Sequence, residues 1–415
     1  MLDECDRASE RGDTGALYRE LRKLEKRGQK KAPMDSQLTK EEFKTHFEKV
    51  SHERFENPPE VLEEVVELTE DLRGTEKAEA WAEKLEKEPD MEEMIKEMKL
   101  MRDSAPGEDG VRLNYLLMGG RGLMEKLLKV VQKMFSSGAE EWEDTLKSGM
   151  VIPLYKMKGD RNDPNNYRGV CLLSMGSRIL ARIMATRLKL WAEDMGVLDD
   201  NQAGFRSRRS TADATQIMVR IQEDAMDLRK RMEGEEVEEG EFPVARLLDL
   251  RKAYPRVNKP ALWGILKKYG LRGKFLKTLQ NLHETTEYKI RGKDGVSETW
   301  IPERGLREGC PSSPGLFNIF HQAVMRVAEK ERRIQGRVEK LEVGLNFKWV
   351  PGSAFPSAKA EQGNSEAVRV NVEKSLFADD TTVVGKAKEI EKGVAKTKEI
   401  MSKFEERKTT IRKKS

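Results

Sequence analysis

The chain contains few of the residues that build disulfide frameworks and zinc sites. Among its 415 residues there are three cysteines and four histidines. Cys5, Cys171 and Cys310 stand far apart, and no CxxC pair occurs. This scarcity argues against a disulfide-stapled fold and against a structural zinc site, and it favours a reducing compartment.

Long apolar runs and a secretory leader are also missing. No stretch approaches the roughly 20 apolar residues that a membrane helix requires. The first residues, Met1–Gly12, are charged and lack the pattern of a signal peptide. We therefore expect an intracellular protein, in the nucleus or the cytoplasm, with no membrane among its partners.

Charge, by contrast, is abundant and unevenly distributed. Charged residues make up 36% of the chain, yet the net charge is only +4. Residues 147–231 hold sixteen Lys plus Arg against ten Asp plus Glu, and Asn201–Thr211 holds three arginines and no acid. This distribution favours a surface that faces a polyanion, although a solvated helical face explains any single run equally well.

Periodicity and turn residues define the expected elements. Residues 1–102, rich in Glu, Lys and Met, predict solvated helices, and the turn residues of Ser104–Gly110 indicate a module boundary. The expected helices are Leu123–Phe135, Arg178–Met195, Ala212–Met232, Pro260–Tyr269, Gly273–His283 and Leu316–Ile334; the expected strands are Gly149–Tyr155 and Val244–Leu250; a hairpin is expected at Lys293-Asp294-Gly295. Residues 336–369 predict a partly structured insertion, and residues 386–415 a charged helix with a basic tail.

Three acidic residues occur where apolar strands are expected to end. Asp249 follows the run Val244–Leu248, and Asp379 and Asp380 lie at the bend of the apolar hairpin Leu376–Gly385. Adjacent carboxylates repel each other unless a cation neutralises them. An Asp-Asp pair alone is more often a solvated turn, but the flanking apolar strands would aim these acids at one end of a sheet.

This set of acids predicts a magnesium site. Carboxylates with no His or Cys nearby favour Mg²⁺ over Zn²⁺, because hard cations prefer oxygen ligands. Three such ligands can converge on two ions, which lie about 3.5–4 Å apart in two-metal phosphoryl chemistry. One ion activates the attacking oxygen and the other stabilises the leaving oxygen. We therefore expect nucleotidyl transfer with two Mg²⁺ ions, with Mn²⁺ as the alternative metal.

Seven segments together resemble the motifs of a known polymerase family. Leu247–Tyr254, Gly305–Pro314 and Phe377–Asp380 resemble, in this order, palm motifs A, B and C of reverse transcriptases, and the non-LTR (LINE-type) retrotransposon branch is the most similar. Four upstream segments resemble the fingers motifs of that branch in the same order: Ala105–Gly110, Val151–Lys156, Asn166–Ser174 and Asn201–Thr211. The resemblance covers about residues 103–402.

The resemblance implies an α+β fold of the right-hand polymerase type. Residues 1–102 would form a helical N-terminal extension, residues 103–243 the fingers, and residues 244–385 a palm with an antiparallel sheet. Residues 386–415 would form a charged C-terminal helix and basic tail. Motif D, the primer grip and the thumb are expected to be absent, as are an endonuclease and a zinc knuckle.

The resemblance also assigns the metal ligands and the residue that selects the sugar. Asp249, Asp379 and Asp380 would be catalytic and would hold both metal ions, with the carbonyl of Leu250 as a further ligand. Tyr254 would stack under the incoming sugar and reject its 2′-hydroxyl. The alternative for this tyrosine is an ordinary aromatic at the start of a helix, since a proline follows it.

Charged and glycine residues complete the implied site. Lys156 and Arg168 would neutralise the triphosphate, and Gly309 would let the backbone approach the nascent base pair. Glu308 stands beside the nucleotide where the family usually has Gln. Template phosphates would be contacted by Arg206, Arg208 and Arg209.

The implied function is extension of a DNA primer on an RNA template with dNTP substrates. A different class of function stays open: a truncated, catalytically silent remnant that at most binds RNA. The missing thumb and Glu308 motivate this second interpretation, whereas the intact trio of acids argues against it. A host-domesticated polymerase or an intron maturase is a third alternative.

Overall fold

The computed structural model describes a defined part of the chain. The described residues are 36–52, 66–67, 69–199, 202–207, 209–212, 214–216, 218–219, 222–223, 226, 243–250, 252–334, 342–345, 368–371, 374–377, 380–386, 394–395 and 409–412. For residues 243–249, and from 330 onward apart from residues 394 and 395, the description is of the backbone.

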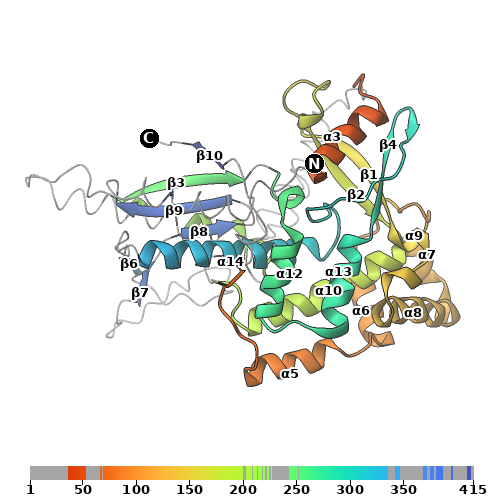
Figure 1. Ribbon diagram of the computed structural model, residues 1–415, viewed down its shortest axis with the longest axis horizontal. Helices are drawn as coiled ribbons and strands as arrows, with labels where there is room; N and C mark the ends of the chain where they lie inside the picture. The colour runs from red at the N-terminus through yellow and green to blue at the C-terminus, as the bar shows by residue number, and fades with distance from the viewer. Residues whose placement is uncertain are drawn as a thin grey trace, which may run out of the picture.

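The described elements form a helical body with one sheet and a separate strand-rich part (Figure 1). The helices of the body are α3 (Lys40–His52), α5 (Glu76–Leu85), α6 (Met91–Leu100), α7 (Leu113–Met118), α8 (Gly120–Ser136), α9 (Asp144–Lys147), α10 (Met175–Asp194), α12 (Lys259–Lys268) and α13 (Gly273–Glu284). Helix α14 (Ser313–Ile334) runs from the body towards the strand-rich part. Three short 3₁₀ helices are η1 (Ala139–Glu141), η2 (Pro164–Asn166) and η4 (Tyr254–Arg256).

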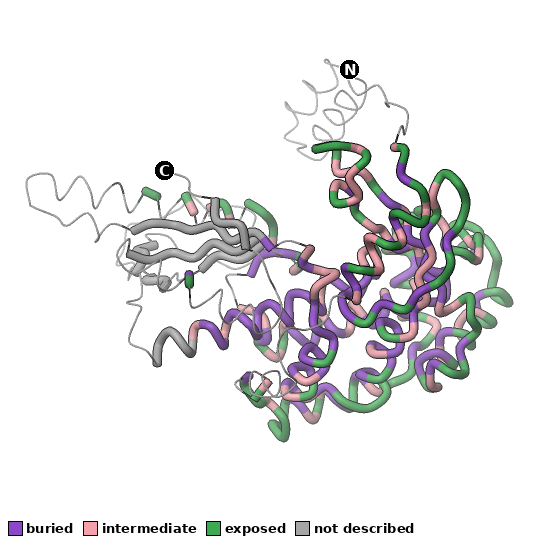
Figure 2. The backbone as a smooth tube through the Cα atoms, turned by 45° about the horizontal axis from the view of Figure 1, so that its top comes forward, coloured by how far each residue is buried: buried purple, intermediate pink, exposed green. Residues whose placement is uncertain are grey.

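Helix α10 lies at the centre of the body. The predicted periodicity is confirmed, because Ile179, Leu180, Ile183 and Leu188 are fully buried. They face α6, α8, α13 and α14, which all contact α10. Burying one such side chain stabilises the fold by about 1.5–3 kcal/mol. Figure 2 colours many residues of this helical part as buried.

Side chains cap the first turns of α6 and α12. The side chain of Asp90 accepts a hydrogen bond from the backbone N–H of Glu93 at the start of α6. Asn258 accepts one from the N–H of Ala261 at the start of α12, where Pro260 follows. Such caps satisfy backbone donors that the helix itself leaves unpaired.

The sheet of the body has the strand order β2-β1-β4-β5. Its strands are β1 (Ser148–Tyr155), β2 (Tyr167–Leu173), β4 (Glu287–Gly292) and β5 (Gly295–Val296). The predicted hairpin is confirmed, because Gly292 pairs with Gly295 across Lys293 and Asp294. Strand β4 comes from the segment expected to be palm, yet it runs parallel to β1 of the expected fingers. The two expected segments therefore share a sheet.

The strand-rich part contains an antiparallel sheet of order β10-β3-β9-β8, as expected for a palm. Its strands are β3 (Pro243–Leu250), β8 (Lys374–Phe377), β9 (Asp380–Lys386) and β10 (Thr409–Arg412). Strands β6 (Glu342–Leu345) and β7 (Val368–Asn371) form a second, two-stranded sheet. Strand β6 lies in the expected insertion, and β7 begins at its end and continues two residues beyond it. The described residues of 212–232 are helical, as predicted.

One prediction for the C-terminal segment is wrong. Residues 409–412 were expected to continue a charged helix into a basic tail, but they form β10, which pairs antiparallel with β3. Thr409, Thr410 and Ile411 are β-branched and favour a strand. Strand β3 would otherwise present one unpaired edge, and β10 covers it.

No helix within the described ranges combines the length and the apolarity needed to cross a membrane.

Arg187 should be a major support of the helical body. Its guanidinium donates to both carboxylate oxygens of Glu93, at 2.8 and 2.6 Å, and to the carbonyls of Leu85 and Lys87. Replacing it in Arg187→Met leaves a partly buried carboxylate and carbonyls without these donors. We expect the free energy of unfolding in urea to fall by about 2–4 kcal/mol.

Arg121→Met is the matched control for this substitution. Arg121 also pairs with a glutamate, Glu125, but its side chain is 92% exposed. An exposed pair of this kind contributes about 0.5 kcal/mol or less. Equal losses in the two variants would show that the buried network around Arg187 does not stabilise the body.

Candidate nucleotide and metal site

The register of the β10-β3-β9-β8 sheet places two of the predicted metal ligands opposite each other. Strands β3 and β9 pair antiparallel, and Asp249 is the direct partner of Asp380. Residues directly opposite in an antiparallel pair lie on the same face of the sheet, with Cβ atoms about 4.5–5.5 Å apart. Two acids that are distant in the chain therefore meet at one end of the sheet. Asp379, the third predicted ligand, lies outside the described residues.

The donor set around this position suits a hard cation. Leu250, the predicted carbonyl ligand, ends β3 beside Asp249, and its side chain is buried. Paired carboxylates and a carbonyl offer the oxygen atoms that Mg²⁺ prefers. Among the side chains that the structure describes, no group of three or more His, Cys, Asp or Glu forms another candidate metal site. That set does not include the side chains of Asp249 and Asp380.

Tyr254 connects the loop after β3 to motif B. Its ring stacks on Phe317 of α14, with ring centroids 5.0 Å apart. Its carbonyl accepts a hydrogen bond of 2.8 Å from the N–H of Leu306. Tyr254 also begins η4, which agrees with the alternative interpretation of this residue. The ring is half-buried, and sugar selection stays a prediction.

Gly309 in motif B allows a close backbone approach, but to the protein's own strand β2. Its φ is +111°, and a Cβ at this position would lie 2.5 Å from the carbonyl oxygen of Cys171. The N–H of Cys171 in turn donates to the carbonyl of Glu308 at 2.6 Å. Motif B is thus attached to the sheet of the body, and its role beside a base pair stays a prediction.

A buried polar network joins motif B to Thr286 and His283. Arg307, 2% exposed, donates to the hydroxyl of Thr286 at 2.8 Å and to Sγ of Cys310 at 3.5 Å. The hydroxyl of Ser312 lies 3.2 Å from that sulfur and 3.0 Å from Nε2 of His283. Burial lowers the pKa of His283 well below its usual value. The network therefore holds a neutral imidazole, and it supports the loop that carries Glu308 and Gly309.

Lys156 and Arg168 lie near each other at the ends of β1 and β2. Arg168 pairs with Leu154 in the sheet register. Lys156 is half-buried, and its ammonium donates to the carbonyl of Asn165 at 2.8 Å. Burial and the charge of Arg168 lower the pKa of Lys156, while the carboxylate of Glu308 raises it. Three of the predicted nucleotide-binding side chains are therefore close enough to interact.

Arg206 is bound within the protein. Its guanidinium donates to both carboxylate oxygens of Glu193, at 2.8 and 2.5 Å, and to the carbonyls of Asp199 and Gln202. Its side chain is 8% exposed. These bonds engage the N–H groups of the Arg206 guanidinium, which argues against the expected contact with template phosphates. Arg208 lies outside the described residues, and Arg209 is half-buried.

Some residues near the site carry no signal in the sequence. Lys252, three residues after Asp249, places its ammonium 3.3 Å from Nε2 of His46 on α3. Arg307 was part of a motif but had no assigned role. The contact between Lys252 and His46 joins segments 206 positions apart, so no local pattern could have predicted it.

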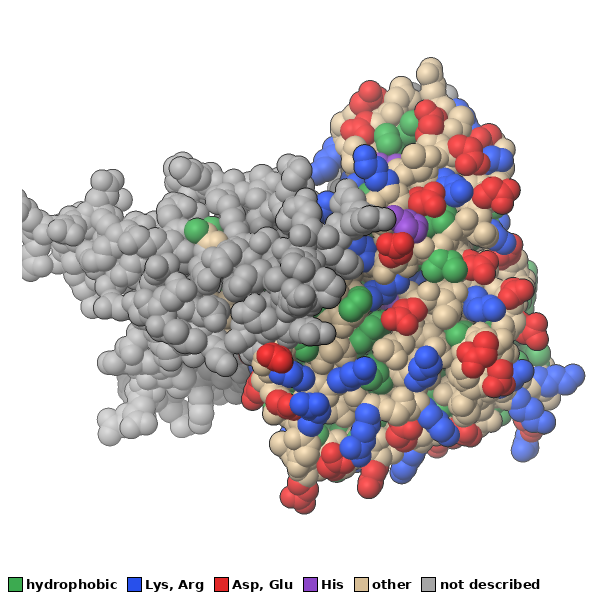
Figure 3. All heavy atoms as spheres, viewed as in Figure 1, with side chains coloured by type: hydrophobic (Ala, Val, Ile, Leu, Met, Phe, Trp, Pro, Cys, Tyr) green, Lys and Arg blue, Asp and Glu red, His purple; other side chains and the backbone are tan. Residues whose placement is uncertain are grey.

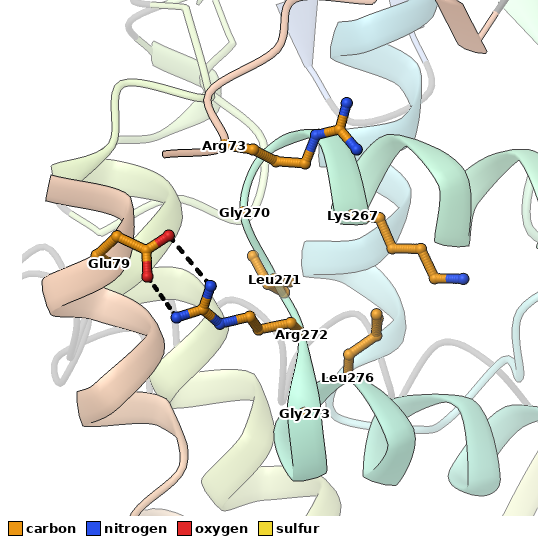
Figure 4. A pocket seen from close by; sticks show the side chains of 8 residues that line it. All are labelled: Arg73, Glu79, Lys267, Gly270, Leu271, Arg272, Gly273 and Leu276. Atoms are coloured by element: carbon orange, nitrogen blue, oxygen red, sulfur yellow. Dashed lines mark hydrogen bonds and ion pairs between the residues drawn. The ribbon is translucent and has the colours of Figure 1, made fainter. Parts of the chain in front are cut away.

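Among the residues that the structure describes, one cavity lies beside motif B and another lies away from the predicted site residues. A small one, of about 60 Å³, lies between α3 and motif B, with Phe47, Tyr288 and Glu308 in its lining. A larger one, of about 320 Å³, lies at the connection between α12 and α13 (Figure 4). There Arg272 reaches across to a bidentate ion pair with Glu79 of α5. No predicted site residue lines this larger cavity.

The face shown in Figure 3 has mixed charge. Lys and Arg side chains are interspersed with Asp and Glu over the coloured, described part of that view. No basic stripe is visible there. The basic character of residues 147–231 thus does not appear as a single patch on this face.

Comparison with known proteins identifies relatives among mobile elements. The profile of the family described as reverse transcriptase (RNA-dependent DNA polymerase) matches residues 156–414. The Pol polyprotein of retrotransposable element R2DM of Drosophila melanogaster is 25% identical over 244 residues, which cover 58% of this chain and 21% of that protein. The transposon TX1 149 kDa protein of Xenopus laevis is 25% identical, over 62% of this chain and 18% of that protein.

A third relative is the RNA-directed DNA polymerase from the mobile element jockey of Drosophila melanogaster. It is 24% identical over 242 residues, which cover 56% of this chain and 25% of that protein. The matched region thus spans about a fifth to a quarter of the length of these relatives.

Gly309→Ala should destabilise the motif B loop. The added methyl group would meet the backbone of β2 at 2.5 Å, and the left-handed φ adds conformational strain. We expect the free energy of unfolding to fall by about 2–4 kcal/mol. Gly196→Ala is the control, because Gly196 has φ +65° and nothing within 4 Å of its Cβ position, so strain alone should cost about 1 kcal/mol. A loss at Gly309 no larger than at Gly196 would contradict the close approach.

Proposed function

Because the chain belongs to the reverse transcriptase (RNA-dependent DNA polymerase) family, we propose that it is a retroelement polymerase of the non-LTR type. It extends a DNA primer on an RNA template, using dNTPs and two-metal nucleotidyl transfer. The family match and the names of the relatives support RNA-directed DNA synthesis. The pairing of Asp249 with Asp380 is the single observation that carries the metal-dependent mechanism.

In this proposal two Mg²⁺ ions are held by Asp249, Asp379 and Asp380, with the carbonyl of Leu250 as a further ligand. Mn²⁺ is the alternative metal. When bound, such ions activate the primer 3′-oxygen and stabilise the leaving pyrophosphate. The fit rests on the chemistry of the donors, since carboxylates brought together at a strand end need a cation to offset their repulsion. The remaining tasks belong to side chains of the fingers and motif B.

Lys156 and Arg168 neutralise the triphosphate in this proposal. A compact ammonium and a forked guanidinium are suited to phosphate oxygens, and the two side chains lie near each other beside Glu308. Tyr254 restricts the space below the sugar and so favours dNTP over rNTP. Its stack on Phe317 holds the ring in a fixed place, which a steric filter requires.

The division into modules follows the same proposal. Residues 103–243 serve as fingers and residues 244–385 as palm, with β4 as a strand that the palm segment contributes to the sheet of the body. RNA template and DNA primer would pass the palm sheet at the end where Asp249 and Asp380 are paired. The described helices within residues 1–102, namely α3, α5 and α6, pack within the helical body beside the proposed fingers.

Primer extension on an RNA template in the presence of Mg²⁺ tests this function. The wild-type chain should incorporate dNTPs, and Asp249→Asn, Asp379→Asn and Asp380→Asn should each lower the rate about a thousandfold or more, since metal ions supply several kcal/mol of transition-state stabilisation. Thermal unfolding should stay cooperative in each variant. Asp144→Asn is the control, because Asp144 is 94% exposed on α9; its rate should stay within about twofold of wild type.

Two results would contradict the proposal. Retained synthesis in Asp249→Asn would refute the metal role of that carboxylate. Salt-sensitive RNA binding without any dNTP incorporation by the wild-type chain would instead identify a silent remnant of a polymerase.

A further inference from the structure

Helix α3 bridges the two loops that flank the proposed nucleotide site. It contacts η2, in the loop between β1 and β2, and η4, in the loop after β3. Phe43, buried on α3, packs edge-on against Tyr167 at the start of β2, with ring centroids 4.9 Å apart. Helix α3 thus packs against the sheet of the body and also contacts the loop that follows Asp249.

The backbone at Lys252 is in a conformation that lysine rarely adopts. Its φ is +54°, in the left-handed region. That region costs a residue with a Cβ about 1–2 kcal/mol, whereas glycine occupies it freely. Backbone strain of this kind is common at functional sites, where the surrounding structure maintains it. A lysine in this position therefore points to a use for its side chain.

His46 on α3 holds that side chain. The ammonium of Lys252 donates to Nε2 of His46 at 3.3 Å. Burial and the charge of Lys252 lower the pKa of His46 to about 4, against the smaller opposing effect of Asp163; Lys156 and Lys49 lower it further. The imidazole is therefore neutral at physiological pH and acts as the acceptor.

Two ammonium groups approach His46 from different modules. Lys156 belongs to the loop after β1, and Lys252 to the loop after β3; the charges of both act on the same imidazole. A neutral imidazole is a weaker acceptor for an ammonium than an anionic phosphate oxygen, because the phosphate adds the attraction between opposite charges. An arriving phosphate can therefore take over the ammonium of Lys252 from His46.

We propose that Lys252 is a further phosphate-binding residue of this site, and that His46 is its positioning residue. Lys252 would contact the β- and γ-phosphates of the incoming dNTP, and the pyrophosphate after it leaves. His46 would hold the ammonium in place before the nucleotide arrives. This inference rests on the proposed function, because it places the triphosphate beside Asp249 and Lys156.

The test uses the full chain on an RNA template with a chain-terminated DNA primer. Calorimetry measures the binding of inorganic pyrophosphate with Mg²⁺, and extension of an ordinary primer gives KM and kcat for dNTP. Lys252→Met removes the charge and keeps most of the side chain. We expect its dissociation constant for pyrophosphate and its KM for dNTP to rise about 10- to 100-fold, the usual effect of losing a hydrogen bond to a charged group. Affinity for the template–primer should not change.

Two further variants distinguish the effect of losing the charge from an effect on folding. Lys252→Gly relieves the backbone strain, so it should fold at least as stably as wild type and yet show the same loss of pyrophosphate binding. Lys126→Met is the control, since Lys126 is exposed on α8, and its constants should equal those of wild type. Wild-type pyrophosphate binding in both Lys252 variants would overturn the inference.

Variants of His46 test the positioning role. His46→Gln keeps a neutral acceptor and should retain a KM for dNTP within about threefold of wild type, whereas His46→Leu should raise KM about 3- to 10-fold with little change in kcat. An equal rise in both variants, or a fall in kcat alone, would refute positioning through the hydrogen bond.

The outcomes also separate this inference from the proposed function. If wild type extends primers and Lys252→Met behaves like wild type, the inference fails and the polymerase function stands. If wild type incorporates no dNTP but binds pyrophosphate in a manner that depends on Lys252, the polymerase function fails and the phosphate site stands.

Discussion

The pairing register between β3 and β9 is the constraint on which the rest of the site depends. It makes Asp249 the partner of Asp380, although the chain between them includes four helices and several strands. A slip of one residue would move one acid to the opposite face of the sheet, because side chains alternate with a period of two. Strands β10 and β8 flank the pair on both sides. The sheet therefore sets whether a shared cation site exists at all, and the loops can only refine it.

The loops that surround this end of the sheet are attached to one another by backbone contacts. Tyr254 bonds to Leu306 and so joins motif A to motif B, while Glu308 bonds to Cys171 and joins motif B to the sheet of the body. Arg307 occupies a buried position with hydroxyl and thiol partners. A loop that is held at both ends keeps its geometry before a substrate binds, which is what electrostatic preorganisation requires. In the site that we propose, the position of Lys252 against His46 would extend this preorganisation to the phosphates of the nucleotide.

Much of this arrangement could be predicted from local patterns, and the remainder depends on long-range contacts. Apolar periodicity predicted α10, and the Asp-Gly turn predicted the β4–β5 hairpin, because both depend on residues a few positions apart. The acids after apolar strands predicted a shared site, and the register agrees with that expectation without describing their side chains. Strand β10 was missed because the charge of residues 386–415 suggested a helix with a basic tail, whereas the open edge of β3 favours a strand. The ion pair of Arg206 with Glu193 and the bond between His46 and Lys252 have no signature in any single segment.

Disulfide trapping across the palm sheet tests the central register most directly. In a chain that carries Asp249→Cys and Asp380→Cys, the two residues are direct partners, and opposed Cα atoms in antiparallel strands lie within the range that a disulfide can bridge. Mild oxidation should therefore give a high yield of the cross-linked peptide by mass spectrometry. The pair Asp249→Cys and Thr381→Cys, shifted by one residue, should give little. A high yield from the shifted pair and none from the direct pair would show that the two acids do not meet, and the account of the metal site would fail.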